Sequence, residues 1–153
     1  MNVRLGILFA AAAALAATPA VADPDKLYVL LGSHHVDVQP GYQPFVEVNP
    51  GVMAFYEQDG FDLVFGAYRN SFGKMSVSVA ASKTLFQGRN ASLAVFAGAA
   101  IYPGNGANFA VHAGDLVPMI GITVELGPTF LSVLPGDGAS HDAMVAYGLK
   151  FEF

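Results

Sequence analysis

A histidine and a serine near the ends of two predicted strands are the residues of this sequence best suited to chemistry. His35 ends the Ser-His-His run 33–35, and Ser71 lies inside the polar stretch 68–74, Tyr-Arg-Asn-Ser-Phe-Gly-Lys. A histidine that takes the proton of a serine hydroxyl is the smallest arrangement that supports acyl transfer. Taken alone, the stretch around Ser71 is more typical of an ordinary turn, because Asn, Ser and Gly are common turn residues.

Two adjacent histidines on a strand cannot share one metal ion. Neighbouring side chains on a strand point to opposite faces, so only one of His34 and His35 can face inward. We therefore expect no metal site here, and the absence of cysteine excludes a thiolate site or a disulfide. A phase that turns Leu27, Val29 and Leu31 inward also turns His35 inward, whereas the opposite phase selects His34. Polar residues at positions 33 and 37 favour the first phase.

The elements that must position these residues follow from an unusual composition. Hydrophobic residues make up 54% of the chain and charged residues 12%, about half the charged share of an ordinary soluble domain. Beyond the first 22 residues the sequence has no run of about 20 apolar residues that could form a transmembrane helix. A closed β-barrel is the other structure that satisfies every backbone group in hydrocarbon. The composition therefore predicts a barrel in a membrane.

The first 22 residues have the features of a secretory signal. Arg4 supplies a positive start, residues 7–17 a short apolar core, and residues 20–22 (Ala-Val-Ala) a cleavage site. We expect cleavage before Asp23, so that residues 23–153 form the mature domain. A retained N-terminal anchor is the alternative, which the short core disfavours. Without Arg4 the number of basic residues falls from seven to six, and 12 acidic residues remain. This negative net charge argues against a nucleic-acid partner.

Turn signals divide the mature part into segments of about ten residues, the length of a barrel strand. Residues 59–60 (Asp-Gly) and 127–128 (Gly-Pro) predict tight turns, and residues 103–106 (Pro-Gly-Asn-Gly) predict a longer loop. The fold that we expect is all-β, an eight-stranded antiparallel transmembrane β-barrel. The predicted strands cover residues 26–38, 44–57, 60–70, 73–85, 90–102, 114–126, 128–135 and 142–153.

Within these segments one face is apolar and the other is small and mixed. In segment 73–85, Met75, Val77 and Val79 share the apolar face, while Ser76 and Ser78 share the other. A lipid-facing surface and a mixed lumen produce this alternation in a membrane barrel. The alternative is a soluble barrel or sandwich with an apolar core. Its outer face would then need more charge than Gly, Ala and Ser supply.

The predicted lumen is narrow and partly apolar. Eight strands leave an interior that holds side chains or one small ligand, which argues against a pore. Because methionine adapts to irregular apolar shapes, such a lumen suits a hydrocarbon chain, and a simple packed core of the same composition is an equal alternative. The apolar residues expected to point inward are Met53, Phe55, Val64, Phe96, Met119 and Met144. We take all of them except Val64 and Met144 as candidates for binding the hydrocarbon chain.

Several short motifs, taken in order, resemble those of the lipid A palmitoyltransferase family of outer-membrane barrels. The resemblance covers most of the mature chain and departs at one position of the site. Where the family has Asp before Ser, this chain has Asn70, which orients or donates a hydrogen bond but cannot act as a carboxylate. The matching segments are 33–35, 47–51 (Glu-Val-Asn-Pro-Gly), 68–74, 116–118 (Leu-Val-Pro), 127–130, 134–136 and 150–153.

The resemblance implies an enzyme of the bacterial outer membrane that moves an acyl chain from a phospholipid donor to lipid A. It implies His35 as the base, Ser71 as its catalytic partner and Asn70 beside them, with no cofactor. The terminal Phe153 resembles the C-terminal Phe that the barrel-assembly machinery reads in outer-membrane barrels. For such a barrel we expect a monomer.

Three prolines fall within the predicted strands or at a strand end. Proline donates no hydrogen bond to the ladder, so it weakens strand pairing where it lies. By resemblance, Pro50, Pro118 and Pro135 mark places where the wall opens and a lipid tail enters sideways. The alternative is that they only bend or end strands.

Two other functions stay open at this point. One is a non-catalytic small barrel that binds a lipid or a partner, which Asn70 favours. The other is an esterase that uses the same His and Ser with water as the acceptor.

Overall fold

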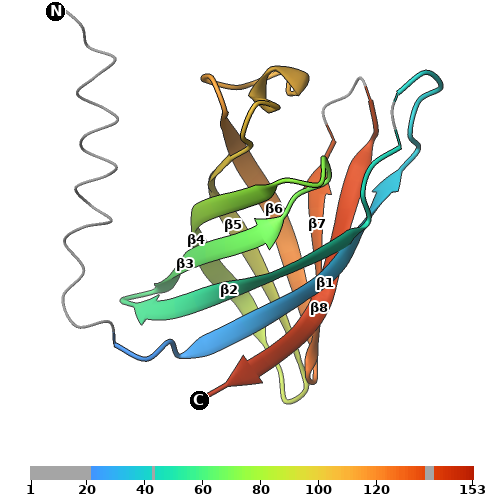
Figure 1. The fold of residues 1–153 in the computed structure, drawn as a ribbon. Coiled ribbons are helices and arrows are strands. Elements are labelled where there is room, and N and C mark those ends of the chain that lie inside the picture. The colour runs from blue at the N-terminus through green and yellow to red at the C-terminus, as the bar shows by residue number, and fades with distance from the viewer. Residues whose placement is uncertain (1–21, 43, 137–139) are drawn as a thin grey trace, which may run out of the picture.

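The computed structural model describes residues 22–42, 44–136 and 140–153. The expected signal sequence lies outside these residues except for Ala22. The chain forms a closed barrel in which every strand pairs antiparallel with its sequence neighbours and the first strand pairs with the last (Figure 1). The elements are β1 (Lys26–Val36), β2 (Val48–Gln58), β3 (Phe61–Arg69), β4 (Met75–Gln87), β5 (Ala91–Ile101), the short 3-10 helix η1 (Gly106–Asn108), β6 (Leu116–Leu126), β7 (Thr129–Pro135) and β8 (Ala143–Glu152).

The prediction of an all-β, eight-stranded antiparallel barrel is confirmed, and most strand bounds agree within two residues. The predicted tight turns at 59–60 and 127–128 are present, with Gly60 at φ +87° and Gly127 at φ +55°. The largest difference is β2, which begins at Val48 rather than at residue 44. The backbone of the preceding segment bonds elsewhere, because the Val46 N–H donates to the Ser71 carbonyl at 2.8 Å.

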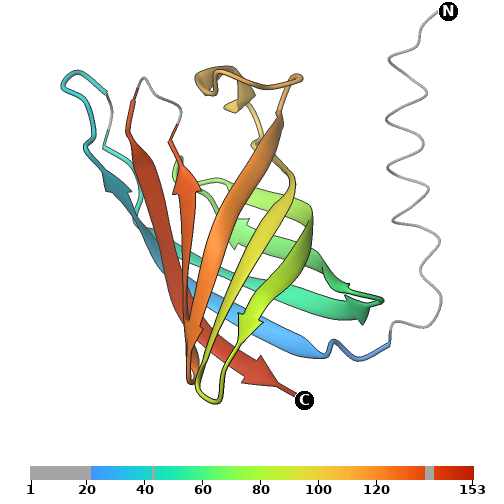
Figure 2. The ribbon, with the colours of Figure 1, turned by 180° about the vertical axis from the view of Figure 1, so that it is seen from behind.

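The two ends of the barrel differ. Figure 2 shows the longer β1–β2 and β5–β6 connections at one end and the short β4–β5 and β6–β7 turns at the other. We call these the loop end and the turn end. Since β1 and β3 run in the same direction, the residues that follow them share the loop end. In the part of the chain that the structure describes, no helix is long and apolar enough to cross a membrane.

Burial confirms the predicted alternation of faces on β4. Val77 and Val79 are exposed at 57% and 46%, whereas Ser76 and Ser82, on the other face, are buried. The lumen is therefore lined by the small and mixed faces. The large apolar side chains exposed on the outer faces of the eight strands include Leu31, Val52, Phe65, Val79, Ile101, Ile120, Ile122, Leu131, Tyr147 and Leu149.

The predicted phase of β1 is only half right, because a bulge interrupts it. Tyr28 and Leu30 are buried, so Leu27, Val29 and Leu31 do not point into the lumen as expected. The register with β8 shifts between Leu30 and Gly32, where β1 carries one extra residue. A one-residue bulge exchanges the two faces. Beyond it odd-numbered residues are buried, and His35 is buried while His34 is exposed.

Candidate functional site

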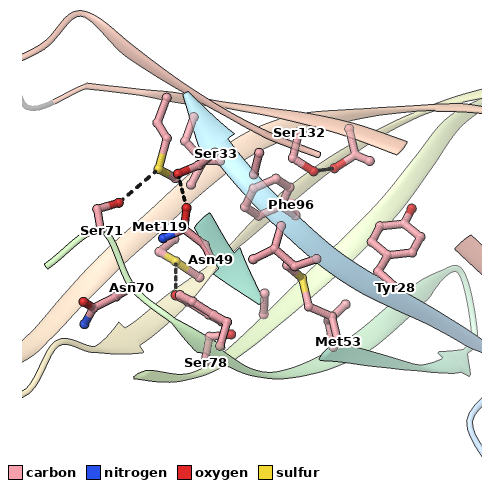
Figure 3. A pocket seen from close by; sticks show the side chains of 18 of the residues that line it. Tyr28, Ser33, Asn49, Met53, Asn70, Ser71, Ser78, Phe96, Met119 and Ser132 are labelled. Atoms are coloured by element: carbon pink, nitrogen blue, oxygen red, sulfur yellow. Dashed lines mark hydrogen bonds between the residues drawn. The ribbon is translucent and has the colours of Figure 1, made fainter. Parts of the chain in front are cut away.

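The lumen contains a cavity that reaches from the loop end toward the middle of the barrel. Its volume is about 90 Å³, and its wall at the loop end includes Asn70 and Ser71 (Figure 3). Farther in, it is lined mostly by apolar side chains with a few small hydroxyls. All four residues predicted to bind an acyl chain line it, namely Met53, Phe55, Phe96 and Met119.

The cavity is too small for a long hydrocarbon chain without movement of its walls. A volume of about 90 Å³ holds roughly six to nine waters in this measure. Met53, Met119 and Met144 all line the space. Methionine has three rotatable bonds and a thioether that fits irregular shapes. Rotation of these side chains is therefore the least costly way to lengthen the cavity.

A layer of aromatic rings closes the cavity toward the turn end. Tyr28 stacks on Phe130, with ring centroids 4.0 Å apart, and lies 4.4 Å from the ring of Phe55. Phe130 is exposed at only 1%. Such packing leaves no continuous path along the lumen among these residues.

A carboxylate lies beneath this aromatic layer and gathers donors from three other strands. Glu125 on β6 accepts hydrogen bonds from Lys26 Nζ at 2.8 Å and from the Tyr28 hydroxyl, both on β1. It also accepts from Ser92 Oγ on β5 at 2.8 Å and from Lys150 Nζ on β8 at 3.1 Å. A buried carboxylate is stable when its charge is paired and its oxygens are hydrogen-bonded. The cluster therefore ties β1, β5, β6 and β8 together at the turn end.

Ser71 lies in the β3–β4 turn at the loop end of the cavity. Its side chain is mostly buried, with 9% of the residue exposed. Its hydroxyl faces the sulfur of Met144, with 3.9 Å between Oγ and Sδ. Its carbonyl accepts the bond from Val46, so the β1–β2 connection fixes the backbone at this position.

Asn70 organises the turn that carries Ser71. Its Oδ1 accepts from the backbone N–H of Phe72 at 2.9 Å and from that of Lys74 at 3.1 Å. Its Nδ2 donates to Ser76 Oγ at 2.9 Å, and the residue is exposed at only 2%. Both amide atoms are thus used inside the turn, which is a positioning role for the loop that presents Ser71.

His35 lies at the loop end of β1, where aromatic rings enclose it. The ring of Phe45 stacks on the imidazole at 4.0 Å and 14°, and the ring of His141 meets it edge-on at 4.9 Å and 76°. The residue is exposed at 5%, and its Nδ1 atom is buried without a hydrogen-bond partner in the part of the chain that the structure describes. A buried polar atom without a partner is uncommon in proteins and calls for an explanation such as a ligand.

The structure brings the three predicted catalytic residues to one end of the barrel. Met144 is the residue paired with His35 across the β1–β8 seam, and its sulfur contacts the Ser71 hydroxyl. Among the described residues no hydrogen bond joins His35 to Ser71. The Ser71 hydroxyl instead faces the sulfur of Met144, and His35 is not among the residues that line the cavity.

Sequence reasoning missed two rings of this site, Phe45 and His141. Phe45 belongs to the segment that was predicted to open the second strand, and His141 lies just before β8. Phe45 reaches His35 from the β1–β2 connection, whereas His141 reaches it through the closure of the barrel, which brings β8 beside β1. The available signal was weak, because His141 is simply one of four histidines in the chain. The described residues also hold no group of three or more potential metal ligands.

The three strand prolines lie where strand pairing changes. Pro50 faces the stretch of β1 in which the β1–β2 register shifts. The β6–β7 ladder runs from Leu126 to Ile122 and does not continue toward Pro118, while Pro135 ends β7. An apolar groove of about 630 Å³ includes residues of this seam in its wall, together with residues of β3, β4, β5 and β8. Its wall shares Ser82, Phe96 and Leu134 with the lumen cavity.

The fold and site define a class of protein, a closed eight-stranded barrel with a blind and largely apolar interior cavity. Comparison with known proteins adds nothing to this description. The sequence matches no model of a protein family, and the search of curated proteins found no similar sequence.

Proposed function

We propose that this chain is an outer-membrane enzyme that transfers an acyl chain from a phospholipid to lipid A and holds the chain in the lumen. The observation that carries the proposal is the cavity, which has Ser71 at its loop end and apolar walls farther in. A cleft lined by apolar side chains with a few convergent polar groups is the usual form of a site for an apolar ligand.

The outer surface supports a membrane location for this activity. Large apolar side chains such as Val77 and Ile120 are exposed at 57% and 63% on the outside of the wall. Apolar patches of this extent on a soluble monomer are rare and mark contact with lipid or protein. In a bilayer the same surface contacts acyl chains, and the donor phospholipid is then a neighbour of the barrel.

The chemistry assigns one role to each catalytic residue. The Ser71 hydroxyl attacks the ester carbonyl of the phospholipid while its proton passes to His35. The bond to the glycerol oxygen breaks, and that oxygen leaves with the proton from His35. A lipid A hydroxyl then attacks the acyl-serine, its proton passes to His35, and the Ser71 oxygen recovers a proton as the new ester is released. Before the first step the Ser71 hydroxyl leaves its contact with Met144.

The route of the acyl chain follows from the strand seams. At the β6–β7 seam the ladder ends at Ile122, and the outer groove there shares wall residues with the cavity. Proline cannot donate to a ladder, so Pro118 and Pro135 leave this seam unsealed. A lipid tail moving from the bilayer into the lumen at this place avoids crossing the aromatic layer at the turn end.

Mass spectrometry of lipid A tests the proposal. Cells that express the gene are expected to contain lipid A with one additional acyl chain, and cells without it are not. His35→Ala and Ser71→Ala should remove the additional chain, while His34→Ala, which changes an exposed neighbour, should not. An identical lipid A pattern with and without the gene would contradict the proposal, as would full modification by both variants.

A non-catalytic lipid-binding barrel is the second candidate, and one arrangement favours it. The Asn70 amide is wholly engaged in the turn, and the Ser71 hydroxyl faces Met144 rather than His35. On this alternative, lipid extracted from the purified protein contains a bound hydrocarbon chain, and Ser71→Ala leaves both the bound lipid and the lipid A pattern unchanged.

A further inference from the structure

His141 packs against the two rings that form the His35 pocket. The rings of His35 and Phe45 are nearly parallel, and His141 stands across both of them, at 76° to the first and 70° to the second. Its ring centroid lies 4.9 Å from that of His35 and 5.2 Å from that of Phe45. Edge-to-face contacts at these separations are favourable for aromatic pairs. His141 therefore limits rotation of the imidazole from the side that Phe45 leaves open.

The backbone on both sides of His141 is bonded to the end of β1. The Gln39 N–H donates to the Ser140 carbonyl at 2.9 Å, and the Asp142 N–H donates to the Val36 carbonyl at 3.0 Å. The side chains of Ser140 and His141 are also joined, with 2.8 Å between Oγ and Nδ1. Gly136 permits this crossing, because a Cβ there would lie 2.0 Å from the His141 carbonyl oxygen.

Among the described residues, no carboxylate is hydrogen-bonded to the imidazole of the enclosed His35. In serine hydrolases a carboxylate bonded to one ring nitrogen holds the imidazole in its working orientation. Here Asn70 is used in the β3–β4 turn, and within the described ranges His35 Nδ1 is buried without a hydrogen-bond partner. Orientation must then come from packing, and the two rings around His35 supply it.

We propose that His141 is a positioning residue for His35, which holds the imidazole in one orientation by edge-to-face packing. The expected effect of His141 on the rate of acyl transfer rests on the proposed function. The contact itself does not depend on which reaction the site performs, and it is testable without substrate.

Kinetics of acyl transfer by the full-length protein in detergent give the first test. His141→Ala is expected to lower kcat between about tenfold and a hundredfold, as small misplacements of a catalytic group do. KM for the phospholipid donor should not change, because His141 does not line the cavity. His141→Phe keeps the ring and should restore most of kcat. His112→Ala, at an exposed histidine of the β5–β6 loop, should match the unaltered protein.

Nuclear magnetic resonance of the same proteins, labelled at histidine, gives the second test. Signals of His35, assigned by their loss in His35→Ala, should form one set in the unaltered protein and in His141→Phe. They should shift and broaden or double in His141→Ala, or in His141→Leu if the alanine variant does not fold.

The outcomes separate the two claims. Unchanged His35 signals in His141→Ala or its leucine substitute would overturn the positioning role, and so would a loss of kcat that His141→Phe does not restore. The expected changes in the His35 signals, together with no acyl transfer by the unaltered protein, would support the positioning role and overturn the proposed reaction alone.

Discussion

The hydroxyl of Ser71 lies 3.9 Å from the sulfur of Met144, the residue that pairs with His35 across the β1–β8 seam. Met144 is therefore a neighbour of both proposed catalytic residues, through its side chain for Ser71 and through strand pairing for His35. An unbranched side chain with staggered rotamers moves aside at low cost. On the proposed function this arrangement is a closed form of the site, and we expect a bound acyl chain to displace Met144.

Stiffening residue 144 should lower the rate of acyl transfer. Isoleucine is branched at Cβ and restricted at its first torsion angle, so Met144→Ile is expected to lower kcat by about tenfold or more. Met144→Ala removes the obstruction and should keep or raise kcat. Equal rates for the two variants, each confirmed as folded, would show that Met144 does not control the approach of His35 to Ser71.

The β3–β4 turn should depend strongly on the amide of Asn70. Asn70→Ala leaves two turn N–H groups and Ser76 without their partner. We expect a loss of about 2–4 kcal/mol in the free energy of unfolding, because unsatisfied buried groups each carry a penalty. Denaturant unfolding followed by circular dichroism measures this loss.

Asn70→Asp is the matched variant for the same turn. An aspartate still accepts from Phe72 and Lys74, and the Ser76 hydroxyl can reverse its bond and donate to the carboxylate. The variant should therefore unfold at a denaturant concentration closer to that of the unaltered protein than Asn70→Ala does. Equal losses in both variants would contradict the role given to Oδ1.

Removing the carboxylate at the turn end should destabilise the barrel. Glu125→Ala leaves Lys26 and Lys150, exposed at 17% and 13% in their side chains, without their shared partner. Breaking a buried ion pair in this way costs about 3–5 kcal/mol. Glu152→Gln is the control, since the Glu152 side chain is 62% exposed and, among the described residues, accepts a side-chain hydrogen bond from Lys150 alone, and exposed pairs contribute under about 1 kcal/mol. Similar unfolding midpoints for the two variants would contradict the account of this cluster.

Local patterns were sufficient to predict most of the barrel. The alternation on β4 and β6 and the turn at 59–60 depend only on neighbouring residues, and the structure confirms them. The phase of β1 could not be predicted in the same way. Its bulge after Leu30 depends on the registers with β2 and β8, which are formed only when the barrel closes.

The site was predicted in part, for the same reason. His35 lies near the end of β1, and Ser71 follows β3. Because these strands run in the same direction, topology could predict that both residues lie at the same end of the barrel. The contact of His141 with His35 joins residues far apart in the chain and depends on closure of the β1–β8 seam. The hydrogen-bond donors to Glu125 come from β1, β5 and β8. The local sequence around Glu125 contains no pattern that predicts them.

Contact of the outer face with lipid tails is the claim on which the proposed function depends, and quenching by lipid tests it most directly. The chain has no tryptophan, so each variant reports from one site. Phe65→Trp places the indole on the outer face, where Phe65 is 43% exposed, and Phe130→Trp places it in the aromatic layer of the lumen, where Phe130 is 1% exposed and does not line the cavity. In vesicles of phospholipid brominated on its acyl chains, the account predicts strong quenching at position 65 and much weaker quenching at position 130. Unquenched fluorescence at position 65, from protein that stays in solution without detergent, would contradict it.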